Sequence, residues 1–126
     1  MGAVAYLYVA LGGALGASGR LALSVLLSPS PLGGFPVAVL CANILGCFVM
    51  GSLAALMVSK GTDDPLKLFL MPGLLGGFTT FSAFSLEAFA LAERGAWSLA
   101  ALYVGLTVLG TLGAVALGWV LVRGGV

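Results

Sequence analysis

Four long apolar segments, separated by short polar connections, constrain the fold of this chain more than any other feature of its sequence. A helix needs about 20 apolar residues to cross the hydrocarbon core of a bilayer, and each segment is at least that long. Of the 126 residues, 61% are hydrophobic and only 7% are charged, too few to cover a soluble domain. We therefore predict an all-α membrane protein with a single four-helix transmembrane domain over residues 1–126. The expected helices span residues 3–27, 36–58, 66–91 and 97–122.

The composition also excludes several functions. The chain has no histidine, which removes imidazole metal sites and histidine-based catalysis. Because no nucleophile–base pair or metal-ligand cluster is evident either, we do not expect an enzyme. A net charge of +1, without a basic run, argues against binding to nucleic acid. Cys41 and Cys47 fall on different faces of the second predicted helix, so we expect them to fill the core as small apolar groups rather than form a disulfide.

The third apolar segment is interrupted at its centre. Glycine lowers helix propensity by roughly 1 kcal/mol against alanine, and an unpaired hydroxyl at membrane depth costs several kcal/mol (about 2–7 by transfer measurements). Irregular backbone survives there only where it is buried in protein or lines a wet cavity. We therefore predict a broken third helix, which is either a packing kink or an ion site. The run comprises Gly73, Gly76, Gly77, Phe78, Thr79, Thr80, Phe81, Ser82, Phe84 and Ser85.

Other polar residues within the apolar segments are few. Asn43 is the strongly polar side chain of the second segment, and it either joins helices by hydrogen bonds or serves a site. Tyr103, Thr107 and Thr111 recur every four residues and form a polar stripe on one face of the fourth segment. Such hydroxyls can bond back to a carbonyl of their own helix, but three in register favour a polar track.

Small residues four positions apart predict close contacts between helices. The pairs Gly12–Gly16 and Ala42–Gly46 lie in the first two segments. The fourth segment carries Gly110, Ala114 and Gly118. Small residues at this spacing let a second backbone approach closely within a membrane.

The charged residues do not favour one orientation in the membrane. In a four-helix chain, Lys60, Lys67 and Arg123 lie on one side, and Arg94 lies on the other with Arg20 if its side chain extends that way. The positive-inside rule needs a clearer excess than this. The chain is therefore expected to insert both ways, and two oppositely oriented copies can pair around a two-fold axis in the membrane plane.

Three motifs, in this order, resemble those of the Fluc/CrcB fluoride channels. Residues 12–20 resemble the first-helix glycines that lead to an arginine, and residues 42–46 resemble the asparagine motif of the second helix. Residues 76–85 resemble the most diagnostic stretch of that family. The resemblance covers essentially the whole chain.

The resemblance implies an antiparallel homodimer in the bacterial plasma membrane, surrounded by lipid, that exports fluoride ion passively through two pores. It also implies a structural sodium ion at the dimer centre, bound by the backbone carbonyls of Gly77 and Thr80. Arg20 matches an arginine near the vestibule, and Glu87 matches a carboxylate at the pore entrance. The implied pore residues are Asn43, Thr79, Phe81, Ser82, Phe84, Ser85, Tyr103, Thr107 and Thr111.

Two other functions fit a chain of this size. A small dual-topology exporter of organic cations, driven by protons, also has four spans, but it needs a carboxylate deep in the membrane. Here Glu87 and Glu93 lie toward a helix end, and Asp63 and Asp64 lie in a connection. A non-conducting assembly subunit would use the small-residue faces but leaves the polar stripe without a role.

Overall fold

The computed structural model describes residues 1–124, and in this range all regular structure is helical. It has four helices that are long and apolar enough to cross a membrane, as predicted. The first, second and fourth spans are α1 (Ala3–Leu26), α2 (Val37–Leu56) and α6 (Trp97–Arg123). The third span, Pro65–Glu93, comprises α3 (Pro65–Leu68), η1 (Phe69–Leu75), α4 (Gly76–Phe78) and α5 (Phe81–Glu93). The expected bounds are therefore correct to within about two residues, the usual uncertainty of a helix end.

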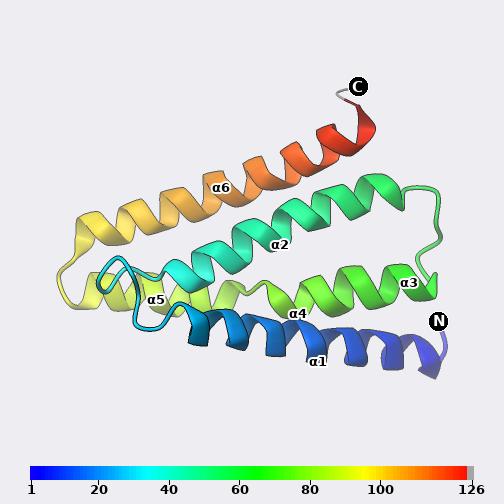
Figure 1. Cartoon of the computed structure of the whole chain (residues 1–126), viewed down its shortest axis with the longest axis horizontal. Helices are drawn as coiled ribbons and strands as arrows, with labels where there is room; N and C mark the ends of the chain where they lie inside the picture. The colour runs from blue at the N-terminus through cyan, green and yellow to red at the C-terminus, as the bar shows by residue number, and fades with distance from the viewer. Residues whose placement is uncertain (125–126) are drawn as a thin grey trace.

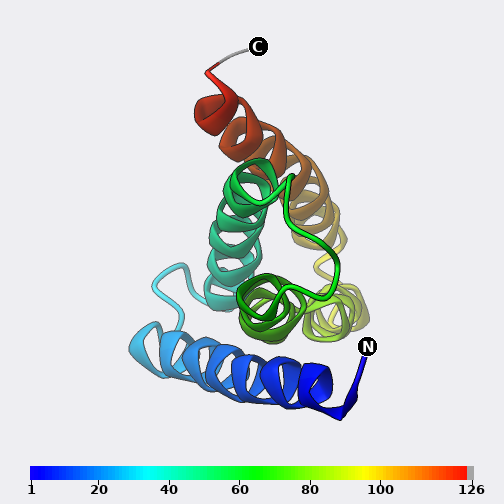
Figure 2. The same ribbon diagram turned by 90° about the vertical axis from the view of Figure 1, so that its right-hand side faces the viewer.

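The four spans alternate in direction. The start of α1, the end of α6 and the connection between α2 and α3 lie at one end of the molecule, and the other two connections lie at the opposite end (Figure 1). The third span runs between α1 on one side and the α2–α6 pair on the other (Figure 2). The first half of the third span, η1 and α4, packs on α1, whereas its second half, α5, packs on α6.

Glycines mark the places where two backbones come closest. A side chain at Gly12 or Gly16 of α1 would collide with the carbonyls of Phe69 or Leu74 in η1. On the other side of the molecule, a side chain at Gly118 of α6 would collide with the Phe48 carbonyl of α2. The small-residue faces predicted from the sequence are thus confirmed as contact surfaces: those of α1 and α6 meet the backbone of another span, whereas Gly46 of α2 meets the side chains of Phe78 and Thr79.

The third span departs from a regular α-helix twice. Its first irregularity is η1, a π-helical stretch with Pro72 inside it. Proline has no N–H to donate to the carbonyl one turn earlier, and a wider turn accommodates its ring. The second irregularity, between α4 and α5, is a complete break, and it lies within the glycine- and hydroxyl-rich run predicted to be irregular.

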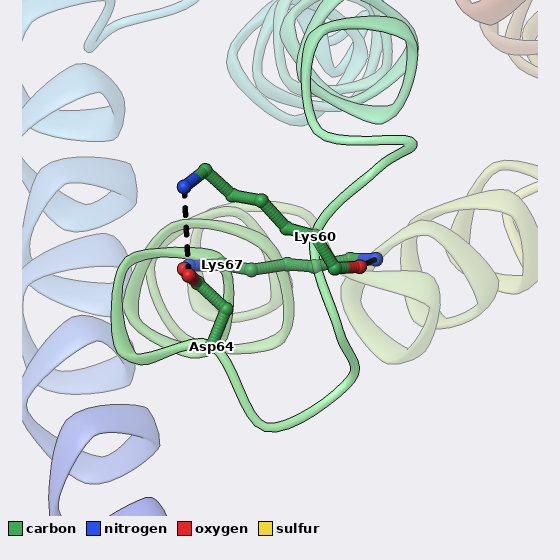
Figure 3. Close-up of polar contacts among 3 residues, drawn as sticks. All are labelled: Lys60, Asp64 and Lys67. Carbon is green, nitrogen blue, oxygen red and sulfur yellow. Dashed lines mark hydrogen bonds and ion pairs between the residues drawn. The ribbon is translucent and has the colours of Figure 1, made fainter.

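The connection before α3 carries most of the charged residues at its end of the molecule. Asp64 caps α3, since its carboxylate Oδ1 accepts a hydrogen bond of 3.0 Å from the Lys67 backbone N–H. Lys60 Nζ lies 3.5 Å from Asp64 Oδ2, and Lys67 Nζ donates to the Lys60 carbonyl (Figure 3). The Lys67 backbone hydrogen bond, helped by the charge of Lys60, lowers the pKa of Asp64 below its ordinary value. Together with Asp63, the connection and α3 hold two acids and two bases, so residues 60–67 add no net charge to this end.

Candidate functional site

The break in the third span consists of two extended residues. Thr79 has φ/ψ of −82°/155° and Thr80 has −151°/126°. Each threonine hydroxyl bonds to one of the flanking helices. Thr79 Oγ1 donates to the Leu75 carbonyl at 2.9 Å, and Thr80 Oγ1 accepts from the Ala83 N–H at 3.1 Å, which caps α5. The Thr80 hydroxyl therefore satisfies an N–H group that the break exposes, whereas the Thr79 hydroxyl adds a second donor to a carbonyl that already accepts the Thr79 N–H.

Asn43 of α2 anchors the break from outside. Its Nδ2 donates to the Thr80 carbonyl at 2.9 Å, and its Oδ1 accepts from the Thr80 N–H at 2.7 Å, although the two residues are 37 positions apart. Asn43 is only 5% exposed. Backbone groups that have lost their helical partners are costly in a membrane, and this one amide satisfies both groups of Thr80. A second N–H of Asn43 is left over to donate elsewhere.

The break and Asn43 form one wall of a cavity of about 230 Å³. Residues of α6 form the facing wall, so the cavity lies between α2, the break and α6. None of its lining side chains is charged. The lining residues are Asn43, Cys47, Thr79, Thr80, Phe81, Phe84, Thr107, Val108 and Thr111. Seven of these nine residues were predicted as site residues from the sequence, and Cys47 and Val108 were missed.

The polar stripe of α6 divides into satisfied and unsatisfied hydroxyls. Thr111 Oγ1 donates to the Thr107 carbonyl of its own helix at 2.7 Å. By contrast, Thr107 Oγ1 and the Tyr103 hydroxyl are buried and have no hydrogen-bond partner within the described residues. Thr107 is 6% exposed and Tyr103 is fully buried. Leaving a buried polar group unpaired costs about 1–3 kcal/mol, so the cavity beside Thr107 is suited to a ligand that accepts hydrogen bonds.

Two phenylalanines connect the break to the protein interior. Phe84 is buried, and its ring centroid lies 5.5 Å from that of Phe81 and 5.3 Å from that of Tyr103. Phe81 is 78% exposed on the surface of the single chain. Phe35, which follows the first connection, packs edge-on against Tyr103 with centroids 5.6 Å apart. The sequence gave no signal for the contact made by Phe35.

Four other predicted residues lie outside this cavity. Ser82 and the Thr80 hydroxyl form a hydrogen bond of 3.2 Å, and Ser85 donates to the Phe81 carbonyl one turn earlier. Glu87 lines a separate pocket of about 90 Å³ together with Arg94 and with Gly34 and Pro36 from the α1–α2 connection. Tyr103 lies in the core beneath the cavity.

Arg20 and Gly77 meet on the α1 side of the third span. Arg20 Nε donates to the Gly77 carbonyl at 3.4 Å, 57 positions away in the sequence. That carbonyl lies just before the break, where the next residues leave the helix. The Arg20 guanidinium therefore contacts the broken segment.

The prediction that both cysteines fill the core is wrong for Cys41. Cys41 is exposed on α2 instead of filling the core, whereas Cys47 is partly buried and lines the cavity. Both thiols are free.

Four membrane-spanning helices, one of them broken beside an uncharged cavity that Asn43 and several threonines help to line, are typical of a multi-pass membrane protein of the ion-transport class. Irregular backbone at this depth requires such surroundings, and the described residues hold no cluster of metal-binding side chains.

Comparison with known proteins identifies the family. Residues 7–119 match the family described as CrcB-like protein, Camphor Resistance (CrcB), and the chain belongs to this family. It is 52% identical over 123 residues to "Fluoride-specific ion channel FluC" of Ruegeria sp. (strain TM1040), covering 96% of each chain. Proteins of the same name from Cereibacter sphaeroides (strain ATCC 17029 / ATH 2.4.9) and Paracoccus denitrificans (strain Pd 1222) are 49% and 47% identical over 122 residues, covering 94% of each chain.

These comparisons confirm three predictions. The family resemblance is correct, the protein is not an enzyme, and it is a multi-pass protein of the bacterial cell membrane.

Proposed function

We propose that this protein is a fluoride-selective channel that exports fluoride passively. The observation that carries the proposal is the uncharged cavity at the break, whose lining includes Thr107, a residue with a buried hydroxyl that has no hydrogen-bond partner within residues 1–124. The names of the relatives support fluoride as the ion. Fluoride enters cells as a neutral weak acid and ionises inside, so the inside-negative membrane potential is enough to drive the anion out.

The cavity offers what a small, strongly hydrated anion needs. Thr107 and the second N–H of Asn43 are available as hydrogen-bond donors. The rims of the Phe81 and Phe84 rings carry partial positive charge, which attracts an anion without the fixed charge that would trap it. The first N–H groups of α5 have no carbonyls one turn earlier, because Thr79 and Thr80 are extended, and they face the break with the positive end of the helix dipole.

The cation-exporter alternative lacks its essential group. Proton-coupled export of a cation requires a carboxylate in the membrane-embedded cavity. No carboxylate lines the cavity at the break, and Glu87 belongs to the smaller pocket beside Arg94. The assembly-subunit alternative gives the unpaired hydroxyls of Tyr103 and Thr107 no role.

We extend the proposal to an antiparallel homodimer with two pores. The cavity includes Phe81, which is 78% exposed on a single chain, so a second copy is needed to close it from lipid. The balanced distribution of lysine and arginine over the two ends of the molecule supports insertion in both orientations. A two-fold axis then gives two equivalent cavities.

A sodium ion at the dimer centre is consistent with the carbonyls at the break. Gly77 lies two residues before the break and Thr80 lies within it, and each of their carbonyl oxygens accepts a single side-chain hydrogen bond, from Arg20 and Asn43 respectively. A carbonyl has two lone pairs, so one remains on each oxygen for a hard cation, which prefers oxygen ligands. The ion would hold the carbonyl dipoles of two copies together.

Removal of sodium tests this part of the proposal. Exchange of sodium for N-methylglucamine is expected to shift the purified protein from dimer to monomer, measured by light scattering in detergent, and return of sodium should restore the dimer. A dimer that is equally stable without sodium would contradict the structural role of the ion. Fluoride flux in the same buffers gives an independent measure.

The function is tested by fluoride efflux from liposomes that contain the purified protein. A channel gives fast, voltage-driven efflux at a fluoride electrode, whereas a cation exporter or an assembly subunit gives none. The Thr107→Val variant is expected to lower efflux about 10- to 100-fold, because a hydrogen bond to a charged group contributes about 1.5–3 kcal/mol. Its thermal stability should not fall, because the lost hydroxyl has no hydrogen-bond partner among the residues that the structure describes.

Thr107→Ser is the matched control, because it keeps the hydroxyl and should retain most of the flux. Wild-type efflux from Thr107→Val would remove Thr107 from the pathway. No efflux from the unmodified protein would contradict the channel itself.

A further inference from the structure

Cys47 lies in the same cavity as the residues assigned to fluoride. It follows Asn43 by four positions on α2, which places the two side chains on the same helix face. Its partly buried thiol lines the cavity together with Thr107 and Thr111. Cys41 is exposed on α2 and is not part of the cavity lining.

A second observation points to a ligand in the cavity beside Cys47. Thr107 of α6 belongs to the lining of this cavity and is 6% exposed, and its buried hydroxyl has no hydrogen-bond partner within the described part of the chain. A cavity of about 230 Å³ has room for several small species, since a single water occupies about 30 Å³ of liquid. A hydroxyl and a thiol across such a cavity are both weak or moderate donors to an anion.

We propose that Cys47 lines the fluoride path and that its thiol is a site where a soft metal ion stops conduction. This inference rests on the proposed channel function. Thiolates bind soft metal ions strongly. When mercuric ion binds, the S–H bond breaks, an S–Hg bond forms and the proton passes to water, with no change in oxidation state. The bound ion then narrows the cavity and places a positive charge in it, which holds fluoride instead of releasing it.

The test uses the full-length protein in liposomes, with mercuric nitrate as the probe. In a Cys41→Ala variant, Cys47 is the sole thiol, and intact-mass spectrometry reports the fraction that carries mercury. Fluoride efflux is expected to fall in proportion to that fraction, by about tenfold or more at full modification, since a path that binds too tightly does not conduct. Dithiothreitol should remove the mercury and restore efflux.

Cys47→Ser is the matched variant, in which Cys41 is the sole thiol. Mercury is expected to leave the efflux of this variant nearly unchanged, so the ratio of its efflux with mercury to its efflux without mercury should be near one. If Cys47→Ser does not conduct, the fall of efflux with the mercury-modified fraction of the Cys41→Ala variant still tests whether Cys47 lines the path. Full modification of Cys47 with undiminished efflux overturns the inference, as does a Cys47 thiol that does not react. If the untreated wild type passes no fluoride, the channel function fails first, and this outcome is distinct from a conducting wild type that mercury does not inhibit.

Discussion

Replacing Asn43 by aspartate is expected to abolish fluoride flux. Asparagine both donates to the Thr80 carbonyl and accepts from the Thr80 N–H, whereas an ionised carboxylate can only accept. The Thr80 carbonyl would lose its donor and face a second acceptor, which costs about 1–3 kcal/mol for the buried group. The carboxylate would also place a negative charge in the cavity. Two like charges 4 Å apart repel by about 4 kcal/mol at an effective dielectric constant of 20, so together these effects reduce flux by several orders of magnitude.

The measurement is fluoride efflux from liposomes at alkaline pH, so that the introduced carboxyl is ionised. Asn43→Ala is the matched comparison, because it removes both hydrogen bonds without adding charge. Its efflux should be higher than that of Asn43→Asp, although alanine also loses the hydrogen bond from the Thr80 N–H that aspartate keeps, so the excess loss in Asn43→Asp is a lower bound on the effect of the added charge. Undiminished efflux from Asn43→Asp would show that Asn43 neither anchors the break nor borders the path.

Gly16→Ala is expected to cause the largest loss of stability. A methyl group at this position would collide with the Leu74 carbonyl, a backbone atom that cannot move aside without shifting η1. Overpacking of this kind costs about 1–3 kcal/mol or more, which exceeds the gain of about 1 kcal/mol from the better helix propensity of alanine. This loss of stability matters more in a membrane than in a soluble protein, because close packing is a main source of helix association in the membrane.

Gly19→Ala is the matched control on the same helix. A methyl group at Gly19 would lie 3.7 Å from the Phe78 ring, which is ordinary contact. We expect Gly16→Ala to lower the midpoint of thermal unfolding in detergent, measured by circular dichroism, and Gly19→Ala to leave it unchanged or raise it. Equal midpoints for the two variants would mean that α1 does not pack on η1 as described.

The sequence predicted the spans and the irregular region because both depend on local features. Apolar length sets the four helices, and the run of residues 73–85 combines poor helix formers with hydroxyls. The break was placed in this run correctly. The π-helical turn at Pro72 was not predicted, since a proline in an apolar segment is compatible with a kink, a helix end or a widened turn.

The sequence could not predict which residue of another span each polar or small residue contacts. Asn43 was recognised as the polar residue of its helix, but its contact with Thr80 joins residues 37 positions apart and depends on how two spans pack. The hydrogen bond from Arg20 to Gly77 is missing from the sequence analysis for the same reason. Likewise, Gly12 and Gly16 predicted a close neighbour without indicating that η1 would be that neighbour.

At the candidate site, some features were predictable from the sequence and others were not. The spacing of Tyr103, Thr107 and Thr111 predicted a common face, but only the structure separates the satisfied hydroxyl of Thr111 from the unsatisfied pair. Cys47 had a usable signal, because it follows Asn43 by one helical turn, yet it was assigned to the core with Cys41. Side-chain type alone does not distinguish a core thiol from one that borders a cavity.

The pairing of one amide with both main-chain groups of Thr80 has a mechanical consequence. It reproduces, with a side chain, the two-bond exchange that fixes neighbouring residues in an antiparallel sheet. Because both polar groups of Thr80 are held, we expect the break to be rigid, so that α4 and α5 keep a constant angle to each other. In the proposed channel, we therefore expect fluoride to pass the break without any opening or closing movement of the third span.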